Sequence, residues 1–196
     1  ASDEHYELHC NMSSLENHIL ISMPHMQDPF FGQSIILVCE HSNDGAMGLI
    51  INKPFEKPEL RVLFQKLPEN QDEILKIIPK VHFGGPVLIE RGIVVHSSSY
   101  TSKDSMKISD EFSITSSSKI LQDIADGNAP EQYKLMLGHA GWEAGQLERE
   151  IENGDWLMQS TSHNFVFNTE ESKMWKIAAG SFGVEMSQIS GLGGSA

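Results

Sequence analysis

The stretch Leu137–Trp156, LGHAGWEAGQLEREIENGDW, decides how the chain is expected to fold. Just before it, the apolar run from Tyr133 to Leu137 predicts a β-strand. The glycines Gly138, Gly141 and Gly145 then predict a tight turn, because glycine adopts backbone conformations that other residues avoid. A strand, a glycine-rich turn and a helix are therefore expected in succession.

The helix is expected over residues 143–153, with Leu147 and Ile151 on its buried face and Gly154 at its C-terminal end. A glycine turn in front of a helix can also bind phosphate through free backbone N–H groups. The glycine spacing matches neither the dinucleotide fingerprint nor a P-loop, and Glu143 would occupy the place of the anion. Backbone geometry therefore explains these glycines better than phosphate binding.

Two apolar runs nearer the N-terminus predict a β-hairpin. Ser34–Cys39 is short and apolar on both alternating faces, as is typical of a buried strand. The tripeptide Asn43–Gly45 favours a turn, and Gly48–Ile51 predicts the returning strand. Pro54 ends this hairpin.

The remaining pattern mixes strands and short helices. The expected strands are Val81–Val87, which runs into the Gly84-Gly85-Pro86 loop, Arg91–His96, Phe112–Thr115, and a closing hairpin of Trp156–Gln159 with Asn164–Phe167. The expected helices are two short ones between Pro58 and Pro79, one capped by Ser116 or Ser117 that ends at Gly127, and one capped by Thr169 that runs to about Ala179. Because hairpins outnumber clear βαβ units, we predict an α+β fold with a mixed sheet.

The charge of the chain limits its partners. Lysine and arginine together number 14 and aspartate and glutamate 27, which gives a formal net charge of −13. Such a balance opposes direct binding to nucleic acid and to an anionic membrane surface. No apolar run in the sequence approaches the ~18 residues that a membrane span requires. We therefore expect a soluble protein whose partner is neither nucleic acid nor membrane.

The cysteines and the two ends of the chain carry further expectations. Cys10 lies in a polar segment and Cys39 in an apolar run, so no framework disulfide is expected and a reducing cytoplasm fits. Residues 1–11 lack the basic and apolar regions of a secretory signal and are expected to form a flexible extension. Residues 191–196, GLGGSA, are expected to form a flexible tail.

Three histidines, His41, His96 and His139, each follow an apolar strand. If those strands ended on one side of the fold, three imidazoles could hold a zinc ion. The sequence nevertheless shows no H-x-x-x-H or C-x-x-C spacing. We therefore predict no metal and no cofactor.

A thiolate–imidazole pair is the second chemical possibility. Cys39 and His41 are two residues apart and would share one face of a regular strand. A cysteine that closes an apolar run more often packs as a small hydrophobe, which makes catalysis the weaker interpretation. Trp142, set among glycines, is instead expected to be an exposed recognition side chain.

Several motifs in a fixed order carry a family resemblance. They are Met23-Pro24, Asp28–Phe31, Cys39–His41, Asp44–Gly48, Asn52–Pro54, Gly84–Val87, Gly92 with His96, Leu137-Gly138, Ala140–Trp142, and Gly145–Glu148 with Asn153 and Trp156. Through these residues the chain, from about residue 15 to about residue 190, resembles the YqgE/AlgH family of small bacterial proteins. We accordingly assign residues 12–190 to one YqgE/AlgH-like domain.

The resemblance implies one compact α+β domain with a branched, mostly antiparallel mixed sheet, a small barrel-like part and flanking helices. It also implies no established reaction, because the family is labelled a transcriptional regulator only through an effect on alginate production. Relatives commonly hold Tyr at the position of His139, which weakens the zinc interpretation further. A protein of charge −13 without a helix-turn-helix pattern is a poor direct DNA reader, so the label favours action through a partner.

We therefore predict a non-enzymatic cytoplasmic binding or regulatory protein that acts through a protein or small-molecule partner. The loops at residues 44–48, 84–86 and 138–142 would form its recognition surface, because binding residues concentrate in loops on a rigid sheet. The predicted binding residues are His41, Asp44, Gly45, Asn52, Gly84, Gly85, His96, Gly138, Gly141 and Trp142. The alternative is a hydrolase or transferase that uses Cys39 or His41 with Asp44 or Glu40 as the orienting carboxylate.

Overall fold

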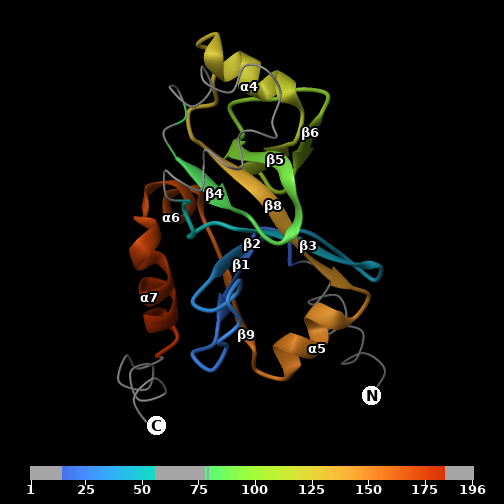
Figure 1. Ribbon diagram of the computed structural model, residues 1–196, viewed down its shortest axis with the longest axis vertical. Coiled ribbons are helices and arrows are strands. Elements are labelled where there is room, and N and C mark those ends of the chain that lie inside the picture. The colour runs from blue at the N-terminus through green and yellow to red at the C-terminus, as the bar shows by residue number, and fades with distance from the viewer. Residues whose placement is uncertain (1–14, 56–77, 79, 184–196) are drawn as a thin grey trace.

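A computed structural model of the protein describes residues 15–55, 78 and 80–183 (Figure 1). The expected extension at residues 1–11, the two short helices between Pro58 and Pro79, and the tail at residues 191–196 lie outside these residues. The strands are β1 (His18–Ser22), β2 (Ile35–Ser42), β3 (Gly45–Ile50), β4 (Val81–Phe83), β5 (Val87–Ser97), β6 (Ser105–Lys107), β7 (Phe112–Thr115), β8 (Tyr133–Glu143) and β9 (Trp156–Ser160). The helices are α4 (Ser118–Ala125), α5 (Gln146–Glu152), α6 (His163–Asn168) and α7 (Glu171–Ser181).

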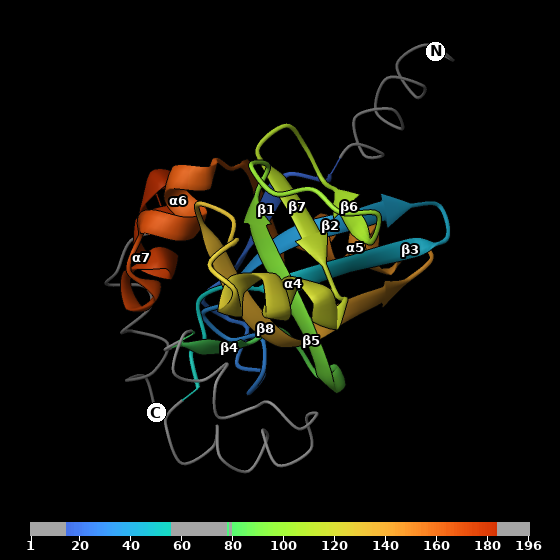
Figure 2. The same ribbon diagram turned by 90° about the horizontal axis from the view of Figure 1, so that it is seen from above.

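The described strands form one curled sheet in the order β6-β7-β5-β8-β3-β2-β1-β9, and β4 branches from β8. All pairings are antiparallel except that between β4 and β8, which is parallel. Helix α4 lies at one end of the molecule, α5 at the other, and α6 and α7 along one side (Figures 1 and 2). The predicted α+β fold with a branched, mostly antiparallel mixed sheet is thus confirmed.

Strand β8 joins the two parts of the sheet. Its first half pairs with β4 and β5, with Leu135 opposite both Val81 and Val94. Its second half pairs with β3, with Ala140 opposite Gly48. The sheet branches at β8 because its neighbours change along its length.

At the branch, the backbone of residues 84–85 lies directly against β8. Gly84 N–H donates to the Leu137 carbonyl at 2.8 Å, and the Gly84 carbonyl accepts from Ile50 N–H at 2.9 Å. A Cβ on Gly138 would lie 2.1 Å from the Gly85 carbonyl oxygen, and one on Gly85 would lie 2.1 Å from the His139 carbonyl carbon. Gly138 also has φ = 76°, which side-chain-bearing residues rarely adopt. Only glycine permits these two backbones to approach so closely.

Apolar side chains form three buried clusters around the sheet. The first lies inside the curl beneath α6 and α7 and includes Ile35, Leu37, Phe112, Val166 and Trp175. The second lies on the opposite face beneath α5 and includes Ile36, Val38, Trp142, Leu147 and Trp156. The third lies beneath α4 and includes Val81, Val94, Ile120, Ile124 and Leu135. Alternate residues of β2 enter opposite clusters, which explains why this strand is apolar on both faces.

Two predicted local structures are confirmed. Strands β2 and β3 form the expected hairpin, with Ser42 opposite Gly45. Ser117 caps α4, since its hydroxyl accepts from Lys119 N–H at 3.1 Å. Gly127 follows that helix with φ = 86°, as expected of a glycine at a helix end.

Two predicted local structures are wrong. The glycine motif does not turn the chain, because β8 runs on to Glu143 and the turn comes only before Gln146. Residues 164–167 belong to helix α6 rather than to a hairpin strand, so β9 pairs with β1. Ser162 caps α6, and Asn168 bonds to Asn164 one turn away, which favours the helix over the strand that its aromatic residues suggest.

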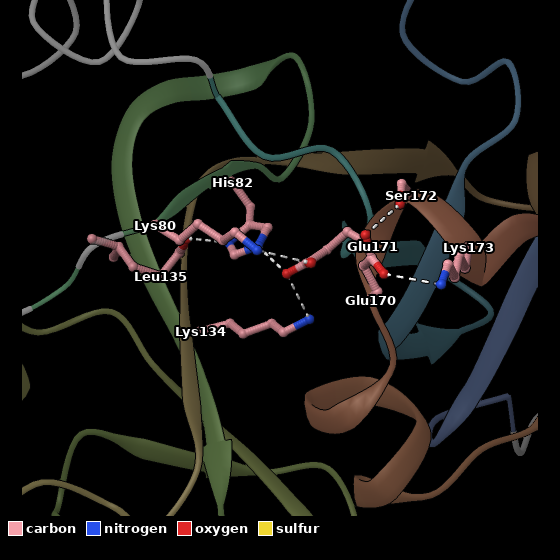
Figure 3. Close-up of polar contacts among 8 residues, drawn as sticks. All are labelled: Lys80, His82, Lys134, Leu135, Glu170, Glu171, Ser172 and Lys173. Carbon is pink, nitrogen blue, oxygen red and sulfur yellow. Dashed lines mark hydrogen bonds and ion pairs between the residues drawn. The ribbon is translucent and has the colours of Figure 1, made fainter.

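Helix α7 begins one residue later than its expected start and is held at its first residue, Glu171 (Figure 3). The Glu171 carboxylate accepts from His82 Nε2 at 2.9 Å and from Lys80 Nζ at 3.1 Å, and Lys134 Nζ lies 3.3 Å from it. His82 Nδ1 lies 3.2 Å from the Leu135 carbonyl. Both ring nitrogens of this buried histidine therefore face hydrogen-bond acceptors, a carboxylate and a carbonyl.

The contacts of the Glu171 carboxylate lower its pKa by more than burial raises it. The hydrogen bond from His82, together with Lys134 and Lys80, holds the pKa of the Glu171 carboxyl well below its usual range. Burial lowers the pKa of Lys134, and Glu171 partly offsets that effect. The cluster joins α7 to β4 and β8 through paired charges.

None of the helices in the described part of the chain has the length and apolar character of a membrane span.

We expect Gly138→Ala to destabilise the fold far more than Gly154→Ala. The two glycines have nearly equal φ values, 76° and 78°, but a Cβ at Gly154 would meet nothing within 4 Å. Gly154→Ala should lower the free energy of unfolding by about 1 to 2 kcal/mol through the dihedral alone. Gly138→Ala should cost at least about 2 kcal/mol more, because a backbone must move. Urea unfolding measures both; equal losses would contradict the close-approach role of Gly138.

We expect Glu171→Gln to lower the free energy of unfolding by about 3 to 5 kcal/mol at pH 7, because it leaves the buried ammonium group of Lys134 unpaired. Since the folded-state pKa of Glu171 is depressed, its stabilisation is present above its ordinary pKa of about 4.3 and is lost as the pH falls further. The gap between wild type and variant should therefore narrow in acid. Unfolding curves from pH 7 to pH 3 test this, with the exposed neighbour Glu170→Gln as control. A gap independent of pH would exclude the ionised carboxylate as its cause.

Candidate functional site

The structure assigns most of the predicted glycines to backbone packing. Gly84, Gly85 and Gly138 meet at the branch of the sheet and present no surface to a ligand. Gly45 lies in the β2–β3 pairing, where a Cβ would approach the Trp142 carbonyl oxygen to 2.4 Å. Gly141 differs, because it is exposed and a Cβ there would meet only Val87 at 3.9 Å.

Trp142 is 8% exposed, so the expectation of an exposed recognition side chain at this position is wrong. Its indole packs edge-to-face against Trp156, with ring centroids 6.4 Å apart. Glu150 Oε1 accepts from Trp142 Nε1 at 3.3 Å and from Trp156 Nε1 at 3.2 Å. One carboxylate thus satisfies two buried indoles and orders the packing of α5 on the sheet.

Asn52 forms hydrogen bonds within the sheet, whereas Asp44 is exposed in a turn. Asn52 Oδ1 accepts from Ile35 N–H, and its Nδ2 donates to the Gln33 carbonyl, both at 2.9 Å. These bonds attach the end of β3 to the start of β2. Asp44 is exposed at the tip of the β2–β3 hairpin, where its backbone N–H donates to Ser42 Oγ.

A β-bulge in β2 separates Cys39 from His41. The β2–β3 register shifts between Val38 and Glu40, so the regular alternation of faces is interrupted there. Cys39 lies in the cluster inside the curl, whereas His41 Nε2 bonds to Glu148 of α5 on the opposite face. The expectation that Cys39 and His41 share a face is therefore wrong.

His96 is fully buried in a chain of polar groups. Its Nδ1 donates to the Ser97 carbonyl at 2.9 Å, and its Nε2 lies 2.8 Å from Thr115 Oγ1, which contacts Ser105 Oγ. Burial lowers the pKa of His96, so the ring is neutral at pH 7. His41, His96 and His139 thus have separate surroundings, and within the described ranges no group of three His, Cys, Asp or Glu side chains could hold a metal ion.

The strongest candidate site among the described residues is a cavity of about 400 Å³ beside the apolar cluster inside the curl. Its walls come from β2, β3, β5, β8 and the β6–β7 hairpin with its flanking residues. They consist of the apolar Met47, Ile93, Met106 and Ile114 and the polar Glu40, Arg91, Asp104, Ser116 and His139. The lining thus combines apolar side chains with convergent polar groups, a combination that small-molecule sites also show.

Charged groups of both signs face this cavity. Arg91 Nη2 donates to Ser116 Oγ at 2.8 Å, which holds the guanidinium between β5 and β7. Partial burial and the charge of Arg91 lower the pKa of His139, and Glu40 opposes them. His139 is therefore neutral at pH 7, and its buried Nδ1 has no hydrogen-bond partner among the described residues.

A second hollow of about 450 Å³ lies near residues 97–99. Its serines are already engaged, since Ser97 Oγ accepts from Gln132 N–H and Ser99 Oγ accepts from Glu131 N–H. Its lining is polar and offers no apolar floor. It is therefore the weaker candidate.

Of the cavity residues, only His139 and Glu40 have a predicted chemical role, as a possible zinc ligand and a possible orienting carboxylate. Arg91 is predicted only as the first residue of a strand and Ser116 only as a possible helix cap. Asp104 and Met106 stand in the sequence with no motif around them. The curl of the sheet, which no local pattern encodes, brings these residues together.

Comparisons with known proteins agree with this fold. The AlgH-like family model matches residues 19–187. The chain is 40% identical over 180 residues to the UPF0301 protein PSHAa2600 of Pseudoalteromonas translucida, covering 91% of this chain and 97% of that protein. It is 37% identical to the UPF0301 protein YqgE of Salmonella paratyphi B, covering 93% of this chain and 100% of that protein.

Solved structures give the same result. The solution structure of the AlgH protein from Pseudomonas aeruginosa superposes with a TM-score of 0.71 at 35% identity, covering 90% of this chain and 93% of that one. The crystal structure of protein DIP2367 from Corynebacterium diphtheriae, at 21% identity and a TM-score of 0.66, shares the fold over 84% of this chain and 85% of that one. By its sequence and its fold, the chain belongs to the YqgE/AlgH family of bacterial proteins.

Proposed function

We propose that this protein is a non-enzymatic binding protein that receives a small-molecule partner in the cavity lined by Glu40, Arg91 and His139. The observation that carries the proposal is the composition of this cavity, which combines four apolar side chains with polar groups of both charges. Its volume of about 400 Å³ lies in the range of small-molecule sites. The site lies on a paired β-framework, which suits recognition of a defined ligand.

The charge of the chain supports a regulatory role without direct DNA contact. At −13, the protein would be repelled by a phosphate backbone. In this proposal, an effect on transcription is exerted through the bound partner, and the cytoplasm is the place of action. A gel shift with duplex DNA at low salt should accordingly show no salt-sensitive complex.

The alternative, a hydrolase or transferase that uses Cys39 with His41, conflicts with the geometry. Cys39 is 3% exposed among isoleucine and valine side chains, and burial raises the pKa of its thiol far above the ordinary value. The thiolate is the nucleophilic form, so this thiol is inert. His41 lies on the other face and bonds to Glu148.

Fragment binding tests the proposed site. We expect small amphipathic fragments to shift the ¹H–¹⁵N signals of cavity residues such as Glu40, Arg91 and His139. Ser116→Trp should block these shifts by filling the cavity, because Ser116 lines it. Ser98→Trp is the matched control, since Ser98 is an equally exposed serine that lines the second hollow. Shifts that gather elsewhere, that survive Ser116→Trp, or that never occur would reject the proposed function.

Alkylation tests the enzymatic alternative. In a Cys10→Ser chain, iodoacetamide should modify Cys39 at least about a hundredfold more slowly in the native protein than in urea, because burial suppresses the thiolate. Mass spectrometry over time gives both rates. Rapid native labelling would restore Cys39 as a candidate nucleophile.

A further inference from the structure

We infer that the cavity binds a zwitterion, namely an apolar α-amino acid or a small molecule that ends in one, with its carboxylate on Arg91 and Ser116 and its ammonium group toward Glu40. This inference rests on the proposed function and adds the chemical class of the ligand. It follows from three features of the cavity lining: a guanidinium, carboxylates, and four apolar side chains.

The guanidinium of the lining belongs to Arg91. Its one hydrogen bond within the described residues goes to the neutral Ser116 hydroxyl, and no carboxylate there lies within 4.0 Å of it. Most of its five N–H donors thus stay available for a bidentate bond to a carboxylate.

One carboxylate of the lining belongs to Glu40. The bulge in β2 turns this side chain into the cavity, next to Met47 and His139. Glu40 is exposed, and its side chain has no ion pair or hydrogen bond with any other residue that the structure describes. Glu40 and Arg91 therefore border one cavity without neutralising each other, which leaves both charges to a ligand.

The four apolar side chains of the lining select the rest of the ligand. Ile93 and Ile114 belong to the core cluster inside the curl, and Met47 and Met106 pack against it. Methionine side chains adapt to ligands of varied shape, which suits an aliphatic or thioether side chain. Asp104 supplies a second carboxylate to the lining, so a purely anionic ligand would meet more negative than positive charge.

Calorimetric titration of the full chain tests the inference with three probes. They are L-methionine, which carries both charges, N-acetyl-L-methionine, which lacks the ammonium group, and L-methioninamide, which lacks the carboxylate. L-methionine should bind at least about tenfold more tightly than either analogue, since each charge-assisted bond contributes about 1.5 kcal/mol or more.

Two variants assign the charges, each with a matched control. Arg91→Gln should lower the affinity for L-methionine at least about tenfold and leave the affinity for L-methioninamide unchanged. Glu40→Gln should lower the affinity for L-methionine to the same extent and leave the affinity for N-acetyl-L-methionine unchanged. The controls Arg149→Gln and Glu152→Gln change exposed residues of α5 outside the cavity and should have no effect. Circular dichroism verifies that all variants fold.

The outcomes separate this inference from the proposed function. Equal affinities for the three probes, or an Arg91→Gln effect no larger than that of Arg149→Gln, would overturn the zwitterion assignment. If L-methionine fails to bind while other fragments still shift the cavity signals, the ligand class is wrong and the proposed function stands. If neither L-methionine nor any fragment binds in the cavity, both the zwitterion assignment and the proposed function are wrong.

Discussion

The close contact between the backbone of residues 84–85 and β8 at Gly138 is the constraint on which the rest of the structure depends. It lets one strand pair with β4 and β5 along its first half and with β3 along its second. Without that approach the two parts of the sheet could not share β8, and the curl would not close around its core. The glycines that look like a ligand loop in the sequence are thus needed where two backbones meet.

The bulge in β2 has a comparable effect on chemistry. A regular strand would place Cys39 and His41 together and Glu40 opposite them. The extra residue instead leaves Cys39 in the core, turns Glu40 into the cavity and sends His41 to Glu148 on α5. One inserted residue therefore removes a possible thiolate–imidazole pair and supplies the cavity with a carboxylate.

Two groups of charged side chains in the described part of the chain differ in their surroundings. The Glu171 carboxylate is surrounded by His82, Lys134 and Lys80, so its charge is used to hold α7 on the sheet (Figure 3). Arg91 and Glu40 face a common cavity without forming an ion pair with each other. The paired charges around Glu171 stabilise the fold. The charges of Arg91 and Glu40 lie beside apolar side chains of the cavity and can bind a ligand, and this contrast motivates the proposed binding role.

The sequence by itself determined the fold class, the β2–β3 hairpin and the Ser117-capped helix, because these follow from hydrophobic periodicity, turn residues and capping over a few residues. The glycine motif is predicted to form a turn, whereas it continues strand β8 and allows a close backbone contact at Gly138. Turns and close strand contacts both require glycine, so the residue type alone does not distinguish them. The tertiary structure alone decided that Trp142 is buried and that Arg91, Glu40 and His139 border one cavity. These outcomes depend on the curl and on one bulge, and both arise from contacts between segments far apart in the chain.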